Sequence, residues 1–200
     1  MKVVIPFKFF NPKSRLSSIL GEKDRKTLAI LMLKDVIDVL KRCDCDVTVI
    51  TPIHIDVDAK IKLDQRTLDD VVNEELKDVP KAVIMSDLPL LNEEVVNRFF
   101  ETDGDVIIAP GRRCGTNMLL VRKKGFRVSY HYGSFLKHLK IARELSMDVK
   151  VFDSFLASVD IDDEGDLLEL MIHGKGKRSE EFLRSLGFKV EFEKVPKLVR

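Results

Sequence analysis

Basic side chains cluster in the first 26 residues of the chain. This segment contains seven Lys or Arg side chains and only two acidic ones. Lys8, Lys13 and Arg15 lie between an apolar run and a long helical pattern. Lys and Arg side chains near the beginning of a helix are suited to binding a polyphosphate. The alternative interpretation is a solvated basic loop without a ligand.

Acidic side chains form two further groups. Asp87 follows the apolar run 81–86, and residues 153–169 contain seven acids and no base. In an extended segment Asp160 and Asp162 point to the same face, so their oxygens can converge on a hard cation such as Mg²⁺. Because burying a carboxylate is costly, Asp87 needs a partner, either such a cation or the N-terminus of a helix. An acidic first helical turn is the alternative for the second group, although it explains Asp160 less well.

Two glycine-containing segments could bind an anion. Gly111 and Gly115 flank two arginines and are followed by Thr116, a pattern that lets an anion approach the backbone closely. Gly133 and Ser134 lead into a helical pattern, where free backbone N–H groups and a hydroxyl could bind a phosphate. A plain turn explains the first segment equally well, and an ordinary helix cap at Ser134 explains the second.

Composition and missing motifs exclude several classes of function. The 200 residues include 34 Lys plus Arg and 33 Asp plus Glu, and this net charge of +1 argues against a nucleic-acid partner. The apolar runs are too short for a membrane span or a signal sequence, and three cysteines are too few for a disulfide framework. We therefore expect a cytoplasmic protein. The chain has no G-x-G-x-x-G after its first apolar run, no P-loop spacing at residues 174–179 and no zinc spacing among its histidines.

The elements that must position these residues alternate along the chain. Nearly continuous apolar runs are typical of strands buried on both faces, and helical patterns separate them, so we expect an α/β fold with a mostly parallel mixed sheet sandwiched by helices. Ligands bind at the carboxyl ends of such strands, where the basic, acidic and glycine segments all fall. Residues 1–173 should form this domain, and residues 174–200 an appendage packed on it or on a partner subunit. The expected strands are residues 2–7, 46–51, 81–86, 105–110, 118–121, 149–152, 157–161 and 188–195. The main expected helices are residues 24–42, 93–100, 135–145 and 179–186. Two more are expected to begin at Thr67 and at Asp162 or Asp163.

Several short motifs are specific as a set because of their order and spacing. They are Ile5-Pro6-Phe7-Lys8, Asn11-Pro12-Lys13-Ser14-Arg15-Leu16-Ser17, Met32-Leu33-Lys34-Asp35-Val36, Ser86-Asp87-Leu88-Pro89-Leu90-Leu91, Pro110-Gly111-Arg112, Gly115-Thr116-Asn117, Ser134-Phe135 with His138, and Asp160-Ile161-Asp162 with Asp166-Leu167. Through them the chain resembles the archaeal 2-phospho-L-lactate guanylyltransferases, which belong to the nucleotidyltransferase branch of the glycosyltransferase-A-like fold. The resemblance implies a Rossmann-like nucleotide-diphospho-sugar transferase fold.

The resemblance also implies an activity and a set of site residues. The enzyme would transfer GMP from GTP to (2S)-2-phospholactate, giving lactyl-2-diphospho-5′-guanosine and pyrophosphate in coenzyme F-420 biosynthesis. Its partners would be GTP and a small phosphorylated acid, with Mg²⁺ as cofactor. The implied residues are Lys13, Arg15 and Asp87 for catalysis, Lys8, Lys13 and Arg15 for the nucleotide, Asp87, Asp160 and Asp162 for Mg²⁺, and Thr116, Gly133 and Ser134 for the phosphate of the acceptor.

The chain departs from the family pattern at two places. Cys114 stands where the family usually has another glycine, and Gly133 is followed directly by Ser134 where relatives have a longer spacer. The alternative functions are a related nucleotidyltransferase acting on phosphoenolpyruvate, a phosphoglycerate, a sugar phosphate or a molybdopterin, and a non-catalytic nucleotide-binding module. The D-x-D at Asp160 and Asp162 leaves a metal-dependent glycosyltransferase as a third. The C-terminal appendage makes a homodimer plausible.

Overall fold

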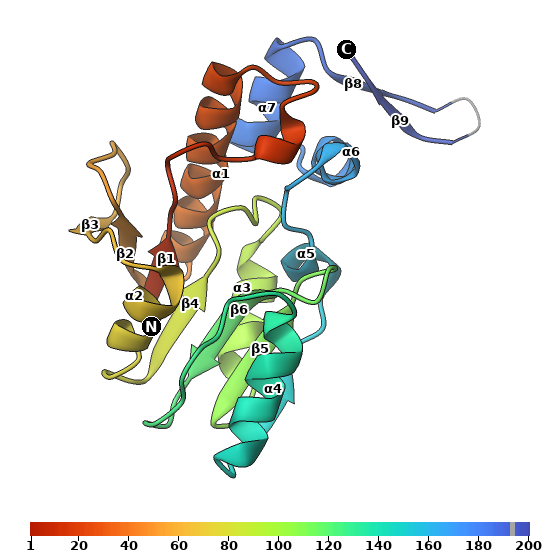
Figure 1. The fold of residues 1–200 in the computed structure, drawn as a ribbon. Coiled ribbons are helices and arrows are strands. Elements are labelled where there is room, and N and C mark those ends of the chain that lie inside the picture. The colour runs from red at the N-terminus through yellow and green to blue at the C-terminus, as the bar shows by residue number, and fades with distance from the viewer. Residues whose placement is uncertain (193–194) are drawn as a thin grey trace.

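A seven-stranded sheet runs through the centre of the molecule (Figure 1). The structure is a computed structural model that describes residues 1–192 and 195–200. The strands of this sheet are β1 (Lys2–Pro6), β2 (Asp46–Thr51), β3 (Lys60–Leu63), β4 (Lys81–Ile84), β5 (Val106–Pro110), β6 (Thr116–Val121) and β7 (Val149–Val151). Their order across the sheet is β3-β2-β1-β4-β6-β5-β7. Strands β2 and β4 pair with β1 in parallel, while β6 is antiparallel to both of its neighbours, which confirms the mostly parallel mixed sheet.

Helices cover both faces of this sheet and connect its strands. They are α1 (Glu22–Arg42), α2 (Leu68–Glu75), α3 (Glu93–Glu101), α4 (Ser134–Glu144), α5 (Phe155–Ser158), α6 (Glu164–His173) and α7 (Arg178–Ser185), with a short 3₁₀ turn, η1 (Ser14–Leu16). Helices α1 and α3 pack on one face, and α2 and α4 on the other. None of the helices in the described part of the chain combines the length and apolarity that crossing a bilayer requires.

Alternating side chains of each strand fill two cores, one on each face of the sheet. Val3 and Ile5 of β1 are buried with the apolar side of α1, whereas Val4 is buried with α2 on the opposite face. This alternation follows from the two-residue period of a strand. Because both faces are covered, β1 reads as an unbroken apolar run. The carboxyl ends of the parallel strands β1, β2 and β4 therefore meet at one protected edge.

The C-terminal residues pack on helix α1 and on the loop before it. Leu183 of α7 and Phe188 are buried in a third apolar cluster with Leu16, Leu28 and Met32. Strands β8 (Lys189–Glu191) and β9 (Lys197–Val199) form an antiparallel hairpin that extends away from the sheet (Figure 1). Helix α7 thus packs against α1 and the hairpin contacts α6, and neither extends the central sheet.

A buried carboxylate attaches α7 to α1. Asp35 is 4% exposed, and its oxygens accept hydrogen bonds from the backbone N–H groups of Arg178 and Ser179, at 2.9 and 3.0 Å, and from the Ser179 hydroxyl at 2.6 Å. We expect Asp35→Ala to lower the free energy of unfolding by about 2–3 kcal/mol, because it leaves buried donors unsatisfied. Urea unfolding measures this. Asp38→Ala is the matched control, since it breaks only an exposed ion pair with Arg178 and should cost less than about 1 kcal/mol.

The structure corrects the strand predicted at residues 157–161. Helix α5 ends at Ser158, and the next residues are irregular. Val159 and Ile161 are buried, and Asp160 between them carries a carboxylate. This alternation of apolar and acidic residues reflects a segment that is buried on one side but pairs with no neighbouring strand. The backbone is held instead by a hydrogen bond from Ile161 N to the carbonyl of Asp87, at 3.1 Å.

Three further elements differ from the sequence predictions. Ser134 is the first residue of α4, and Gly133 is its N-cap with φ +70°, a left-handed conformation that favours glycine. The strand predicted at 188–195 is β8 alone in the described residues, and positions 193–194 lie outside them. Strand β3 was not predicted, because it is short and largely exposed at the edge of the sheet.

Candidate active site

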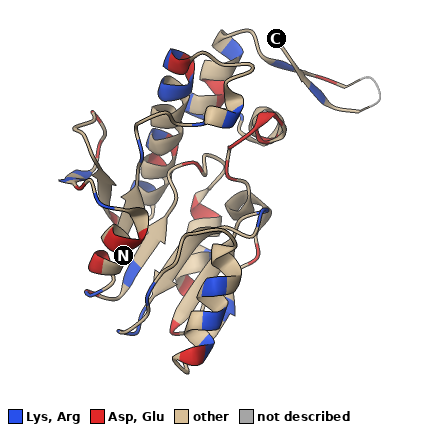
Figure 2. Cartoon of the chain, viewed as in Figure 1, with Lys and Arg blue, Asp and Glu red and all other residues tan. Residues whose placement is uncertain are grey.

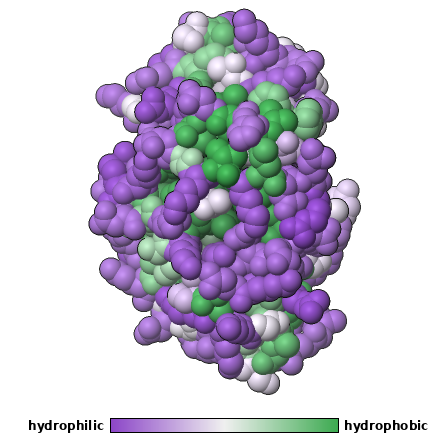
Figure 3. Space-filling view, turned by 90° about the vertical axis from the view of Figure 1, so that its left-hand side faces the viewer, coloured by the Kyte–Doolittle hydropathy of each residue, from purple (hydrophilic) through white to green (hydrophobic). Residues whose placement is uncertain are grey.

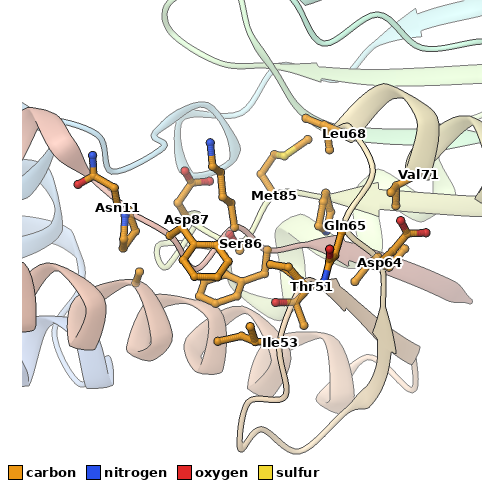
Figure 4. Close-up of a pocket in the computed structure, with 18 of the residues that line it drawn as sticks. Asn11, Thr51, Ile53, Asp64, Gln65, Leu68, Val71, Met85, Ser86 and Asp87 are labelled. Atoms are coloured by element: carbon orange, nitrogen blue, oxygen red, sulfur yellow. The ribbon is translucent and has the colours of Figure 1, made fainter.

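A cavity of about 1000 Å³ opens where β1, β2 and β4 end. This volume lies in the range of small-molecule binding pockets. Figure 4 shows Asn11 and Asp87 toward one end of the cavity and Asp64 and Val71 toward the other. The face of the molecule shown in Figure 3 carries apolar side chains gathered among hydrophilic ones. The cavity thus has a charged end and an arm with an apolar wall formed by Ile50, Pro52, Ile53, Leu68, Val71 and Met85; the arm is also lined by Thr51, Asp64, Gln65, Arg66 and Thr67.

Lys13 joins two carboxylates at the charged end of the cavity. Its ammonium nitrogen lies 2.6 Å from Asp87 Oδ2 and 2.9 Å from Asp162 Oδ1. Burial lowers the pKa of Lys13, but the two carboxylates outweigh that effect and raise it above its ordinary value. Lys13 is therefore a buried permanent cation. The structure brings together three residues that the sequence analysis had selected from three separate segments.

The third predicted metal ligand lies beside this group. Asp160 accepts a hydrogen bond from Asn117 Nδ2 at 3.2 Å. Burial and the neighbouring carboxylates Asp87 and Asp162 raise the pKa of Asp160. The three carboxylates outnumber the two cations that contact them, Lys13 and Arg15, and all of their donor atoms are oxygens. Such a set suits a hard divalent cation.

No cluster of three His, Cys, Asp or Glu side chains in the described residues is arranged to hold a metal by itself. Magnesium is nevertheless commonly held by only one or two carboxylates together with substrate phosphates and water. The donors of Asp87, Asp160 and Asp162 fit that requirement. Lys13 is in contact with two of them, so the described arrangement balances part of their charge with an ammonium.

The remaining predicted nucleotide-binding residues lie nearer the solvent. Arg15 follows Lys13 in the turn η1, and its side chain is 63% exposed with Nη1 3.4 Å from Asp162 Oδ2. Lys8 is exposed and lines the cavity. Lys13 itself has φ +53° in the loop after β1; Lys8 and Lys13 line the cavity, and Arg15 reaches it only through its contact with Asp162. Basic side chains on both sides of the carboxylates can bind an extended polyphosphate.

The three residues implied for the acceptor phosphate do not line this cavity. Thr116 and Ser134 are buried, with their hydroxyl oxygens 3.3 Å apart, and Thr116 Oγ1 is 2.9 Å from Nδ1 of the buried His138. Because His138 Nε2 accepts a hydrogen bond from Ser129 N, Nδ1 carries the proton and donates to Thr116. A Cβ on Gly133 would meet no atom within 4 Å, so that residue faces open space.

His138 gives a test of this buried network by pH. Burial lowers the pKa of His138 to about 4, and this effect outweighs the attraction of Asp69. Between pH 6.5 and 4 the unfolded chain therefore binds more protons than the native protein, and the free energy of unfolding falls as the pH falls. When the pH is lowered from 7 to 4, we expect the free energy of unfolding to fall by about 3 kcal/mol less in His138→Gln than in the wild type. Urea unfolding across this range measures the difference, and parallel profiles would contradict it.

Two side chains that the sequence analysis names only within motifs, without a role in the site, hold the acidic segment. The Asp166 carboxylate is nearly fully buried, accepts hydrogen bonds from the backbone N–H groups of Asp162 and Asp163 at 2.9 Å, and pairs with Arg112. Asn117 holds Asp160 as described above. From the sequence alone, an acidic first helical turn that complements the helix dipole was a sufficient explanation for Asp166. Its contacts with Arg112 and with the backbone of the acidic segment are visible only in the structure.

Comparison with known proteins identifies relatives of the chain along its whole length. The chain is similar to curated proteins named 2-phospho-L-lactate guanylyltransferase: 61% identical to that of Archaeoglobus fulgidus, over 100% of this chain and 97% of the relative, and 53% identical to that of Ferroglobus placidus, over 100% of both.

Similarity to solved structures supports the fold. A possible nucleotide-diphospho-sugar transferase from Desulfovibrio desulfuricans matches with a TM-score of 0.76 and 16% identity, over 93% of this chain and 94% of that one. A 2-C-methyl-D-erythritol 4-phosphate cytidylyltransferase from Thermus thermophilus matches with a TM-score of 0.51 and 14% identity, over 92% and 98%. These structures confirm the nucleotide-diphospho-sugar transferase fold. The family model described as "Guanylyl transferase CofC like" matches residues 1–200, and the chain therefore belongs to this family of guanylyl transferases.

Proposed function

We propose that this chain transfers a guanylyl group from GTP to the phosphate of (2S)-2-phospholactate, giving lactyl-2-diphospho-5′-guanosine and pyrophosphate in coenzyme F-420 biosynthesis. Membership of the guanylyl transferase family supports the reaction class, and the names of the relatives support the acceptor. The observation that carries the proposal is the placement of Lys13 between Asp87 and Asp162 at the charged end of the cavity.

The reaction needs positioning and charge neutralisation more than it needs a base. An oxygen of the acceptor phosphate, already anionic at neutral pH, attacks the α-phosphorus of GTP. The bond from the α-phosphorus to pyrophosphate breaks as the new bond forms. Holding two anions in line and stabilising the charge of the leaving group are then the main contributions of the protein. The charged end of this cavity can make both.

In this proposal the nucleotide lies along the length of the cavity. Lys13 and Arg15, with Lys8 nearby, bind the triphosphate at the charged end. The nucleoside then extends into the apolar arm between β2 and α2, which has the surface to cover a ribose and a base. The acceptor phosphate is assigned to Thr116, Gly133 and Ser134, as the resemblance implies. This assignment rests on the resemblance, because Thr116 and Ser134 are buried and none of the three residues lines the cavity.

Mg²⁺ is the proposed cofactor, held by Asp87, Asp160 and Asp162. Bound there, it would neutralise charge on the triphosphate and on the departing pyrophosphate. Lys13 contacts two of these carboxylates, so its ammonium would hold the triphosphate beside the ion. Removing divalent ions with a chelator should abolish turnover, and MgCl₂ should restore it.

Pyrophosphate release measured with four nucleoside triphosphates and several phosphorylated acids tests the function. We expect the highest kcat/KM for GTP with (2S)-2-phospholactate. Preference for phosphoenolpyruvate or a phosphoglycerate would keep the reaction and change the acceptor, whereas a sugar phosphate or a molybdopterin would assign a different nucleotidyltransferase. Nucleotide binding without pyrophosphate release for any acceptor would overturn the proposal in favour of a binding module.

A further inference from the structure

One amide side chain connects the turn between β5 and β6 to the acidic segment. Asn117, near the beginning of β6, is 4% exposed. Its Nδ2 donates to the carbonyl of Ala157 at 3.0 Å and to Asp160 Oδ1 at 3.2 Å. Both hydrogen atoms of the amide nitrogen are thereby directed at the segment that carries the acids. Within the described part of the chain, no other side chain donates a hydrogen bond to Asp160.

The space for this amide is provided by a glycine. A Cβ on Gly111 would lie 2.6 Å from Asn117 Oδ1 and 3.1 Å from Nδ2, too close for any side chain at that position. The turn itself is closed by a hydrogen bond from Gly111 N to the carbonyl of Gly115, at 3.0 Å. Arg112 N also donates to the carbonyl of Ser158, at 3.1 Å. The amide is therefore fixed between two backbone segments.

The acidic segment depends on such contacts because it belongs to no strand. Residues 159–163 have no ladder of backbone hydrogen bonds in the structure. Ile161 N donates to the carbonyl of Asp87, and Asp162 N donates to the buried carboxylate of Asp166. These bonds fix the backbone at Ile161 and Asp162. Asn117 donates the side-chain hydrogen bond that reaches the Asp160 carboxylate, which also contacts its own backbone N–H.

We propose that Asn117 is a positioning residue that holds the Asp160 carboxylate beside Asp87 and Asp162, so that these carboxylates, together with the phosphates of a bound nucleotide, can hold a divalent cation; this rests on the proposed function. A neutral amide suits the task because it occupies one oxygen without adding positive charge. An ammonium or a guanidinium at this position would compete with the cation for Asp160. Partners that orient a metal ligand in this way typically contribute 10–100-fold to metal affinity.

The experiment measures metal binding separately from catalysis. Mn²⁺ is titrated into the full-length protein by electron paramagnetic resonance in the presence of a GTP analogue with a non-cleavable α,β bond. We expect Asn117→Ala to raise the Kd for Mn²⁺ at least 10-fold, and the Mg²⁺ concentration for half-maximal pyrophosphate release to rise in parallel. Gly111→Ala should have the same effect, because it displaces the amide without removing it. It provides a second readout if Asn117→Ala does not fold.

Asn73→Ala is the matched control. Asn73 also bonds to backbone groups, accepting from Val128 N at 2.8 Å, but it lies on α2, away from the acidic segment. It should lower the midpoint of thermal unfolding and leave the Kd for Mn²⁺ unchanged. An unchanged Kd in both folded Asn117→Ala and folded Gly111→Ala would overturn the proposal, as would a wild-type protein that binds no Mn²⁺ with the analogue.

Failure of the proposed function gives a different result. If the wild type releases no pyrophosphate from GTP and phospholactate while Asn117→Ala still weakens Mn²⁺ binding, the positioning of Asp160 stands and the reaction assigned to the chain is wrong. If the wild type is active and the variants keep its Kd for Mn²⁺, the function stands and Asn117 is a structural residue.

Discussion

Asp87→Asn should lower the kcat for pyrophosphate release at least ~100-fold, the scale of losing one main electrostatic element of an active site. The amide keeps the size of the side chain but removes its charge. Asp87 lies 2.6 Å from the Lys13 ammonium and on the wall of the cavity, so the change acts on the triphosphate end of the proposed site. It also removes one of the three carboxylates assigned to Mg²⁺.

The measurement compares variants whose folding has been verified by circular dichroism and thermal unfolding. Asp46→Asn is the matched control, because it makes the same change of charge at the beginning of β2, where Asp46 pairs with Lys60 at the opposite edge of the sheet. It should leave kcat within about twofold of the wild type, as expected for a surface pair. Near-normal turnover in folded Asp87→Asn would remove Asp87 from the active site.

The convergence of Lys13 and Asp87 could be predicted because it depends on the direction of two parallel strands, whereas Asp162 was placed at the same edge through the strand expected at residues 157–161, which the structure does not contain. Parallel strands place their carboxyl ends at one edge, so residues that follow β1 and β4 must meet there. The charge pattern contains the same information. Lys and Arg outnumber acidic residues in residues 1–26, and residues 153–169 contain acidic residues but no basic ones. The fold brings Lys13 of the first segment into contact with Asp162 of the second at the cavity. Charged residues of both signs are otherwise spread over the whole molecule (Figure 2).

The apolar arm of the cavity could not be predicted in the same way. It depends on β3 and on the loop to α2, where residues 60–63 are largely exposed and lack a long apolar run. Residues 157–161 were misread as a strand because Val159 and Ile161 are buried on one side only. The role of Asn117 was also outside the reach of sequence patterns, since it depends on a glycine six residues earlier and an acid 43 residues later.

The second large effect is expected for Lys13→Met, which should reduce kcat/KM for GTP at least ~100-fold. Methionine keeps much of the length of the side chain and removes the ammonium that bridges Asp87 and Asp162. Because these carboxylates raise the pKa of Lys13, the wild-type side chain stays charged at neutral pH, and no loss of turnover from its deprotonation is expected between pH 6 and 9. The charge at position 13 is therefore what the variant tests.

Lys13→Met should also change how the protein responds to metal without nucleotide. With the ammonium gone, Asp87 and Asp162 lose their buried counter-ion, and a divalent cation can replace it. We expect MgCl₂ to raise the Tm of Lys13→Met by several degrees more than that of the wild type, following the linkage between binding and stability. Lys26→Met removes the ion pair with the exposed Glu22 and a cation–π contact with Phe9, but no contact with the three carboxylates, and should respond like the wild type. Equal responses to MgCl₂ in all three proteins, with normal turnover in Lys13→Met, would show that Lys13 serves neither the triphosphate nor the carboxylates.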